Sequence, residues 1–165
     1  MRISRYPALT VAVLLGIAVL IPAAVSAADH DHHHHHHHHG AADLAELQLN
    51  NGQPWQTDAP LRRGMAAIRD DVAAMLPEIH HDRLPPDGYA ELAERLVEHI
   101  EYIFENCALP RDADDQLHIV LLQIADGLHA MRSGEDARAG AVAAVHALDA
   151  YGEHFDHPGW QTLRH

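Results

Sequence analysis

The sequence predicts an all-α fold, namely an antiparallel up-down-up-down four-helix bundle with a disordered His-rich N-terminal tail. Between residues 57 and 157, four segments repeat apolar residues every three to four positions, which is the period of an amphipathic helix. Short turns containing Pro or Gly separate these segments, and short connections make consecutive helices run in opposite directions. No segment alternates apolar and polar residues as a half-buried strand would.

The chain begins with a segment typical of secretion signals. Two arginines in the first six residues precede an almost purely apolar run over residues 9–21, and small residues follow it. This run is shorter than the roughly 20 residues of a membrane-spanning helix, so we favour a cleaved signal over a membrane anchor. We therefore expect export to the periplasm, removal of residues 1–27 by cleavage after Ala27 or Ala28, and no membrane contact afterwards.

Nine histidines fill a ten-residue window directly behind this signal. They are His30, His32, His33, His34, His35, His36, His37, His38 and His39. Neutral imidazole nitrogens bind Cu(II), Ni(II) and Zn(II), and a flexible run lets several of them close on one ion. Because the tract follows a signal, we interpret it as native and not as a purification tag. Residues 28–54 are thus predicted to form a metal-binding tail with a short lead-in.

The cleavage position changes the predicted chemistry of the new N-terminus. Cleavage after Ala27 places His30 third behind a free amine, where amine, two deprotonated amides and imidazole can surround Cu(II) or Ni(II). Cleavage after Ala28 places the same histidine second, which gives a weaker copper site. Both positions stay open, as does the reading that a third-position histidine is accidental in so His-rich a tail.

Charge, cysteine content and motifs narrow the range of functions. The chain has 24 acidic residues against 11 arginines, for a net charge of −13, and this disfavours nucleic acid and anionic membranes as partners. Cys107 is the only cysteine, so it is a buried thiol, a metal ligand or a link to another chain. The sequence lacks phosphate-binding, metallohydrolase, nucleophilic, di-iron and covalent-haem motifs, so we do not expect an enzyme.

The first helix is predicted to begin after Thr57 or Asp58, either of which can cap it, and to stop before Pro85. Pro77 lies inside this pattern and should kink the helix or end it early, because proline lacks the backbone donor. The apolar stripe consists of Leu61, Met65, Ile68, Val72, Met75, Leu76 and Ile79.

The other three helices follow the same pattern within the predicted bundle domain, residues 55–160. Asp87 is predicted to cap the second helix, with the stripe Tyr89, Leu92, Leu96, Ile100, Ile103 and Cys107 ended by Pro110. Asp112 is predicted to cap the third, with the stripe Leu117, Val120, Leu121, Ile124, Leu128 and Met131. The fourth runs from about residue 135 to His154, with an inward face of Ala141, Val142, Val145, Leu148, Gly152 and Phe155.

Folding the chain back at its turns predicts a second metal site inside the bundle. One half should contain Met65, His99, His118 and either His146 or His154, with Cys107 near the same end, while His80, His81 and His129 lie in the other half. Thioether, thiol and imidazole groups suit copper or haem iron. The candidate ligands are therefore Met65, His99, Cys107 and His118. Each also has a structural interpretation, as a core methionine, a half-buried histidine bonded to a carbonyl, or a buried thiol.

The order of these features resembles the small soluble periplasmic four-helix b-type cytochromes. The shared features are the signal, the early methionine of Arg63-Gly64-Met65, the third-helix residues 123–128 and the fourth-helix ending at residues 149–154. This resemblance implies a haem held between Met65 and His154. The His tract, His99, Cys107 and His118 depart from the family pattern.

We therefore expect a periplasmic, monomeric or weakly dimeric protein that sequesters, buffers or delivers metal ions. Copper is favoured, nickel and zinc are alternatives, and delivery would require a metal-transfer protein as partner. One alternative is a haem-binding electron carrier. The other is a non-catalytic stress or interaction bundle whose His tail is incidental.

Overall fold

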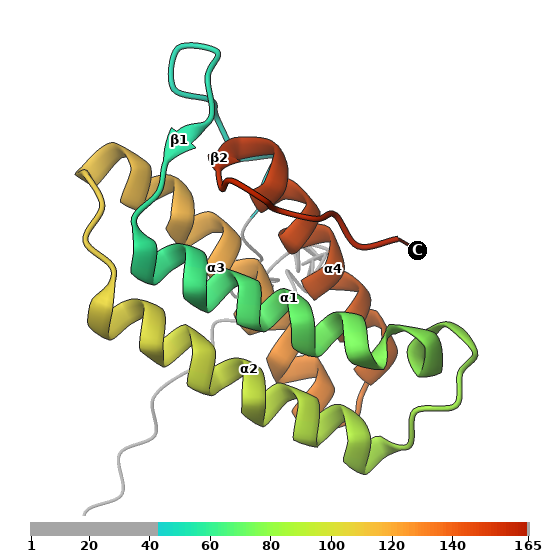
Figure 1. Ribbon diagram of the computed structural model, residues 1–165. Helices are drawn as coiled ribbons and strands as arrows, with labels where there is room; N and C mark the ends of the chain where they lie inside the picture. Colours follow the sequence, from blue (N-terminus) through green and yellow to red (C-terminus); the bar gives the residue numbers. More distant parts are fainter. Residues whose placement is uncertain (1–42, 165) are drawn as a thin grey trace, which may run out of the picture. The chain divides into compact units, whose positions relative to one another are not determined.

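The computed structural model describes residues 43–164 and is mostly helical, with four long helices and little strand (Figure 1). The helices are α1 (Ala59–His80), α2 (Pro86–Asn106), α3 (Arg111–Ser133) and α4 (Ala137–His154). A short 3-10 helix, η1 (Leu44–Glu46), precedes them. The predicted signal and the His tract lie outside the described residues. Within residues 43–164, no helix is long and apolar enough to span a membrane.

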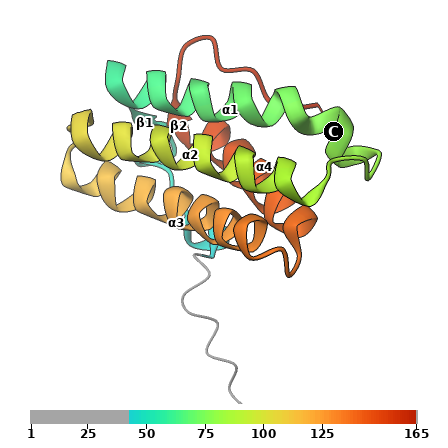
Figure 2. The same cartoon turned by 90° about the horizontal axis from the view of Figure 1, so that it is seen from below.

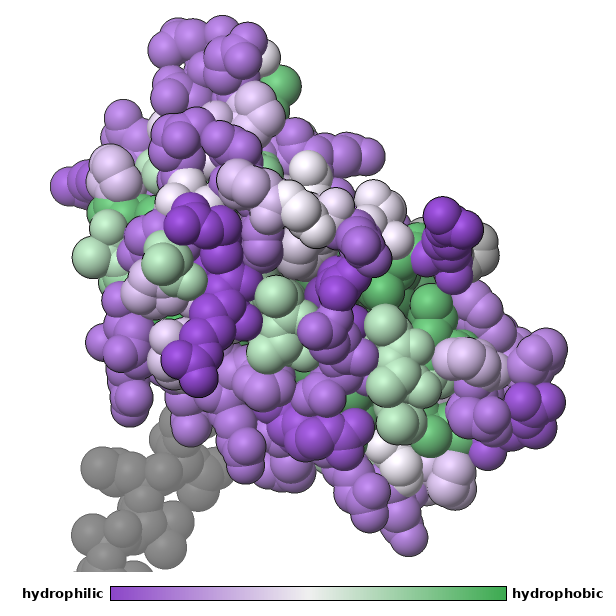
Figure 3. Space-filling view, viewed as in Figure 1, coloured by the Kyte–Doolittle hydropathy of each residue, from purple (hydrophilic) through white to green (hydrophobic). Residues whose placement is uncertain are grey.

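The four helices share an apolar core. α2 lies between α1 and α3, while α4 packs most extensively on α3 (Figures 1 and 2). The predicted stripes supply the core, and their most deeply buried members come from all four helices: Leu61, Met65, Ile68, Leu92, Leu96, Ile103, Leu117, Ile124 and Leu148. Apolar periodicity thus located the buried face of each helix, although Val142, predicted to face inward on the fourth helix, is exposed. The outer face seen in Figure 3 is mostly hydrophilic, with hydrophobic residues grouped over the C-terminal half of α1.

Two glycines allow α3 and α4 to approach closely. A Cβ atom added to Gly127 would lie 2.5 Å from the carbonyl oxygen of Gly140, and one added to Gly140 would lie 2.4 Å from that of Gly127. Neither backbone can move aside without moving a helix. Glycine at both positions therefore explains why this helix pair is the most extensively packed.

The predicted helix starts are right for α1 and wrong for α2 and α3. Asp58 caps α1 by accepting a hydrogen bond from the Leu61 amide at 2.8 Å. The caps of α2 and α3 are instead Pro85 and Pro110, neither of which provides a side-chain hydrogen bond. Asp87 and Asp112 lie inside the first turn, where a carboxylate still interacts favourably with the helix dipole.

Pro77 lies inside α1 and does not end it, so of the two predicted outcomes, a kink or an early end, the early end is wrong. The helix continues to His80, and the amide of His81 bonds to the Pro77 carbonyl at 3.2 Å. Ile79 is 1 % exposed, and its carbonyl accepts a hydrogen bond from Arg138 of α4 at 3.3 Å. Packing of the last turn thus offsets the one hydrogen bond that proline cannot make.

A small parallel sheet was not predicted. Strands β1 (Trp55–Gln56) and β2 (Phe155–Asp156) pair, with Trp55 opposite Phe155. The Thr57 hydroxyl strengthens the junction by donating to the Asp156 carbonyl at 2.6 Å. Phe155, predicted to face inward at the end of the fourth helix, is buried as expected at 2 % exposed but belongs to this strand. Two-residue strands are too short to show an alternating pattern, so sequence periodicity missed them.

The C-terminal segment covers the seam between α1 and α4. Trp160 packs against the Tyr151 ring, with ring centroids 4.8 Å apart, and its indole lies directly over Gly152. Arg69 of α1 donates to the Gln161 carbonyl at 3.4 Å, and Leu163 is 7 % exposed. Residues beyond 160, which the predicted bundle domain left out, therefore contribute to the core.

Candidate metal site

Two of the predicted ligands, Cys107 and His118, line the same cavity. It has a volume of about 220 Å³ and lies between the C-terminal end of α2 and the first turns of α3. Cys107 is the half-buried C-cap residue of α2, and Asp114 completes the polar part of the lining. The remaining lining is apolar.

His118 is oriented by its own helix. Its Nδ1 donates to the Asp114 carbonyl at 2.9 Å and lies 3.6 Å from the Asp114 carboxylate. The neutral ring therefore carries its proton on Nδ1, which leaves the Nε2 lone pair as the atom able to bind a metal. The Phe104 ring of α2 lies close to the His118 ring, with the two ring centroids 6.0 Å apart.

The Cys107 thiol is kept protonated by its surroundings. Burial raises its pKa to about 12, and the negative charge and hydrogen bond of Asp58 add to this shift. The Asp58 carboxylate is itself fixed, because one oxygen accepts from Leu61 and the other accepts from the Ala108 amide, each at 2.8 Å. A soft metal ion bound here would have to displace the thiol proton.

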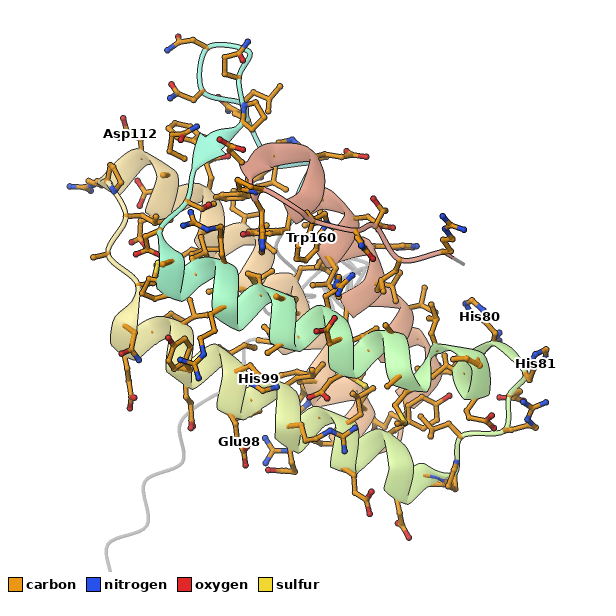
Figure 4. All side chains as sticks on the ribbon, in the orientation of Figure 1. His80, His81, Glu98, His99, Asp112 and Trp160 are labelled. Carbon is orange, nitrogen blue, oxygen red and sulfur yellow. The ribbon has the colours of Figure 1, made fainter. Side chains whose placement is uncertain are left out.

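Met65 and His99 do not line this cavity. Met65 is 0 % exposed within the apolar core. His99 lies on α2 next to Glu98 (Figure 4), and its Nε2 is 3.0 Å from the carboxylate of Asp71 on α1, which Arg95 also approaches at 3.5 Å. Asp71 of α1 is thus held to α2 by a hydrogen bond with His99 and an ion pair with Arg95, which is a structural role.

The histidines of α4 occupy separate places. His154 is half-buried and donates from Nδ1 to the Ala150 carbonyl at 2.8 Å, so its Nε2 is the atom available to a ligand. His146 lines a cavity of about 60 Å³ together with His80. The prediction that His146 could share the Met65 half is therefore wrong. It assumed parallel axes, whereas α4 runs at an angle to α1 (Figure 1).

Among residues 43–164, no three His, Cys, Asp or Glu side chains form a group that could hold a metal ion. His80 and His81 lie together at the C-terminal end of α1, away from His99 (Figure 4). The helical ligands predicted as one set are thus distributed over several places, with Cys107 and His118 as the pair that shares a cavity.

Sequence reasoning missed the carboxylates that position these side chains. Asp58, Asp71 and Asp114 each contact a predicted ligand. Asp71 could have been found, because a hairpin that places Met65 level with about residue 102 also brings Asp71 within about one turn of His99. Asp114 could also have been found, since it lies four residues before His118 on one helix.

Comparisons with protein-family models, with curated proteins and with solved structures found no match for this chain.

Proposed function

We propose that this protein captures metal ions in the periplasm through its His tract and sequesters, buffers or delivers them. The observation that carries the proposal is the tract itself, which has nine imidazoles within ten residues behind a segment typical of secretion signals. Copper is the favoured ion and nickel and zinc are alternatives, because imidazole binds all three and copper binds most tightly. The helical domain then serves as a carrier for the tract.

The helical domain is proposed to be an antiparallel up-down-up-down bundle. Contacts between neighbouring helices support this order. Residues later in one helix contact residues earlier in the next helix, as they must when the two helices run in opposite directions. Gly64 lies against Ile103, whereas Asp71 pairs with Arg95. Between α2 and α3, Glu94 pairs with Arg132, whereas Phe104 contacts His118.

Delivery to a metal-transfer protein is the role that best uses the Cys107–His118 cavity. Thiolate and imidazole together favour Cu(I), so copper that the tract holds as Cu(I) would rest here, with no change of oxidation state, on its way to an acceptor. The high pKa of the Cys107 thiol makes such binding weak, and weak binding suits an ion in transit more than one in storage.

The proposal is tested by titrating the processed protein with Cu(II), Ni(II) and Zn(II) in a calorimeter. One variant replaces all nine tract histidines with asparagine, which preserves length and polarity. A second variant, Cys107→Ser with His118→Gln, leaves the tract intact. We expect the first variant to lose the tight sites and the second to keep them. If the asparagine variant binds each metal as tightly as the natural chain, the tract is not the capture site.

Metal binding by the tract should weaken as the pH falls. Imidazole must be deprotonated to bind, so affinity should decrease as the pH drops through about 6.5. The measurement is the same titration repeated from about pH 7.5 to about pH 5. Undiminished affinity at the lowest pH would contradict imidazole ligation.

A further inference from the structure

A mostly apolar groove runs between α2 and α3. It encloses about 460 Å³, and its apolar lining comes from Val97, Ile100 and Phe104 of α2 and from Ala125 and Leu128 of α3. The polar lining consists of Glu101 from α2 and of His129, Arg132 and Ser133 near the end of α3. Phe104 is 60 % exposed here, although the only other phenylalanine of the chain is buried. Single exposed apolar residues are common, but apolar residues gathered around a groove indicate a binding surface.

The groove continues past Phe104 toward the Cys107 cavity. Phe104 lines both cavities and contacts the His118 ring. Leu122, one turn beyond His118 on α3, is 51 % exposed and extends the apolar surface. The surface is therefore about two to three helical turns long, which matches the contact length of one docked helix.

Acidic side chains follow the α2 edge of this groove. Five exposed glutamates, spaced by three or four residues along α2, form an acidic stripe: Glu91, Glu94, Glu98, Glu101 and Glu105. Glu101 lines the groove directly, and Glu94 pairs with Arg132 across one end at 2.8 Å. Within residues 43–164, the other four acids of the stripe have no ion pair.

These observations together define the occupant. An apolar groove between two helices accepts the apolar face of a third helix, with anchors at spacings of three, four and seven residues. The acidic edge requires basic residues on the flank of that helix, whereas a second copy of this chain would bring acidic groups against acidic groups. We propose that the α2–α3 groove binds an amphipathic helix of a partner protein that carries Arg or Lys beside its apolar face.

This inference is independent of the proposed metal capture, so its test is done with a chelator present. The probe is a fluorescent synthetic helix of about 15 residues, with leucines at the anchor spacing and lysines on the flank. The control peptide has the same composition but leucines scattered around the helix, which preserves charge and removes the apolar face. With the full chain, anisotropy should show binding of the probe that is at least about tenfold tighter than binding of the control.

Four substitutions locate the binding. Phe104→Ser and Glu101→Lys should each weaken binding of the probe about tenfold, because they remove an anchor pocket and a charge at the groove. The matched controls are Leu49→Ser, an exposed leucine outside the groove, and Glu153→Lys, an exposed acid on α4. Both controls should leave the affinity nearly unchanged. All four positions are exposed, and circular dichroism before each titration verifies that the variants are folded.

Three results would overturn the inference. Equal binding of the scattered peptide would show attraction by net charge alone. Equal weakening by Glu101→Lys and Glu153→Lys would show the same. A dimer in analytical ultracentrifugation that dissociates in Phe104→Ser would assign the groove to a second copy of the chain.

Discussion

Asp58 shows how much of this fold depends on one carboxylate. One oxygen caps α1 through the Leu61 amide, and the other holds the Ala108 amide in the turn before α3. The same group contributes to the raised pKa of the Cys107 thiol. The start of α1, the end of α2 and the candidate cavity are thereby coupled through a single side chain.

Asp58→Ala should lower the free energy of unfolding by about 1–3 kcal/mol, because it removes the cap and leaves the Ala108 amide without its acceptor. Asp58→Asn should lower it less, since asparagine is an equally good cap but offers one acceptor oxygen in place of two. Urea denaturation measures both variants. Equal losses for the two would contradict the assigned cap, because asparagine keeps the acceptor for the Leu61 amide and alanine does not.

His157 gives the molecule a pH-dependent contact. Its Nδ1 is hydrogen bonded to the buried Tyr151 hydroxyl at 3.1 Å, and its ring packs on Trp160. Burial lowers the pKa of His157 below its usual 6.5, and the charges of Arg62 and Arg69 lower it further. The unfolded chain therefore takes up a proton here at a higher pH than the folded protein does.

The stabilisation that depends on neutral His157 should be present above about pH 6.5 and should be lost as the pH falls through the lowered pKa. His157→Gln cannot titrate at this position. Between about pH 7.5 and about pH 5, the melting temperature of the natural protein should therefore fall relative to that of His157→Gln. A difference that stays constant over this range would contradict the assigned pKa shift.

At the scale of elements, the α3–α4 contact makes the sharpest prediction. In an open helix, Gly→Ala raises stability by up to about 1 kcal/mol. Gly127→Ala should instead lower it by about 1–3 kcal/mol, because the new methyl group meets the Gly140 carbonyl and no side chain can yield.

Gly88→Ala is the matched control for Gly127→Ala. The methyl group added at Gly88 meets the tip of the Leu84 side chain, which can rotate away. Thermal unfolding should therefore show a large drop in melting temperature for Gly127→Ala and a small change for Gly88→Ala. Stabilisation by Gly127→Ala would contradict the close helix approach.

The elements also show what a sequence can predict. Apolar stripes such as Leu61, Ile68 and Val72 locate the buried faces of helices, because their spacing within one helix can be read from a short stretch of sequence. The β1–β2 pairing and the persistence of α1 through Pro77 were not predictable in the same way. Both depend on contacts between residues far apart in the chain.

At the scale of the whole molecule, the candidate ligands illustrate the same limit. Cys107 and His118 share a cavity because only a short turn separates the end of α2, which carries Cys107, from the first turns of α3, which carry His118. His99 is instead bound to Asp71, and His146 lies beside His80 because α4 is inclined to α1. Counting residues from a turn therefore predicts fairly well which residues of two adjacent antiparallel helices lie level. It predicts poorly for helices whose axes are not parallel.

The chain joins a His tract to a helical domain whose α2–α3 groove is mostly apolar with acidic residues along its α2 edge. If the tract captures metal and the groove binds a basic helix, the two activities should be separable. Phe104→Ser would then leave metal capture intact, while the asparagine variant of the tract would leave peptide binding intact.

The most direct test of metal capture is the metal content of the protein made in cells. The natural chain and the asparagine variant are recovered from the periplasm of copper-exposed cells and weighed by native mass spectrometry. We predict a natural chain processed after Ala27 or Ala28 that carries copper, and a variant, processed in the same way, that carries none. Equal copper on both chains, or a processed natural chain without metal, would contradict the proposed function.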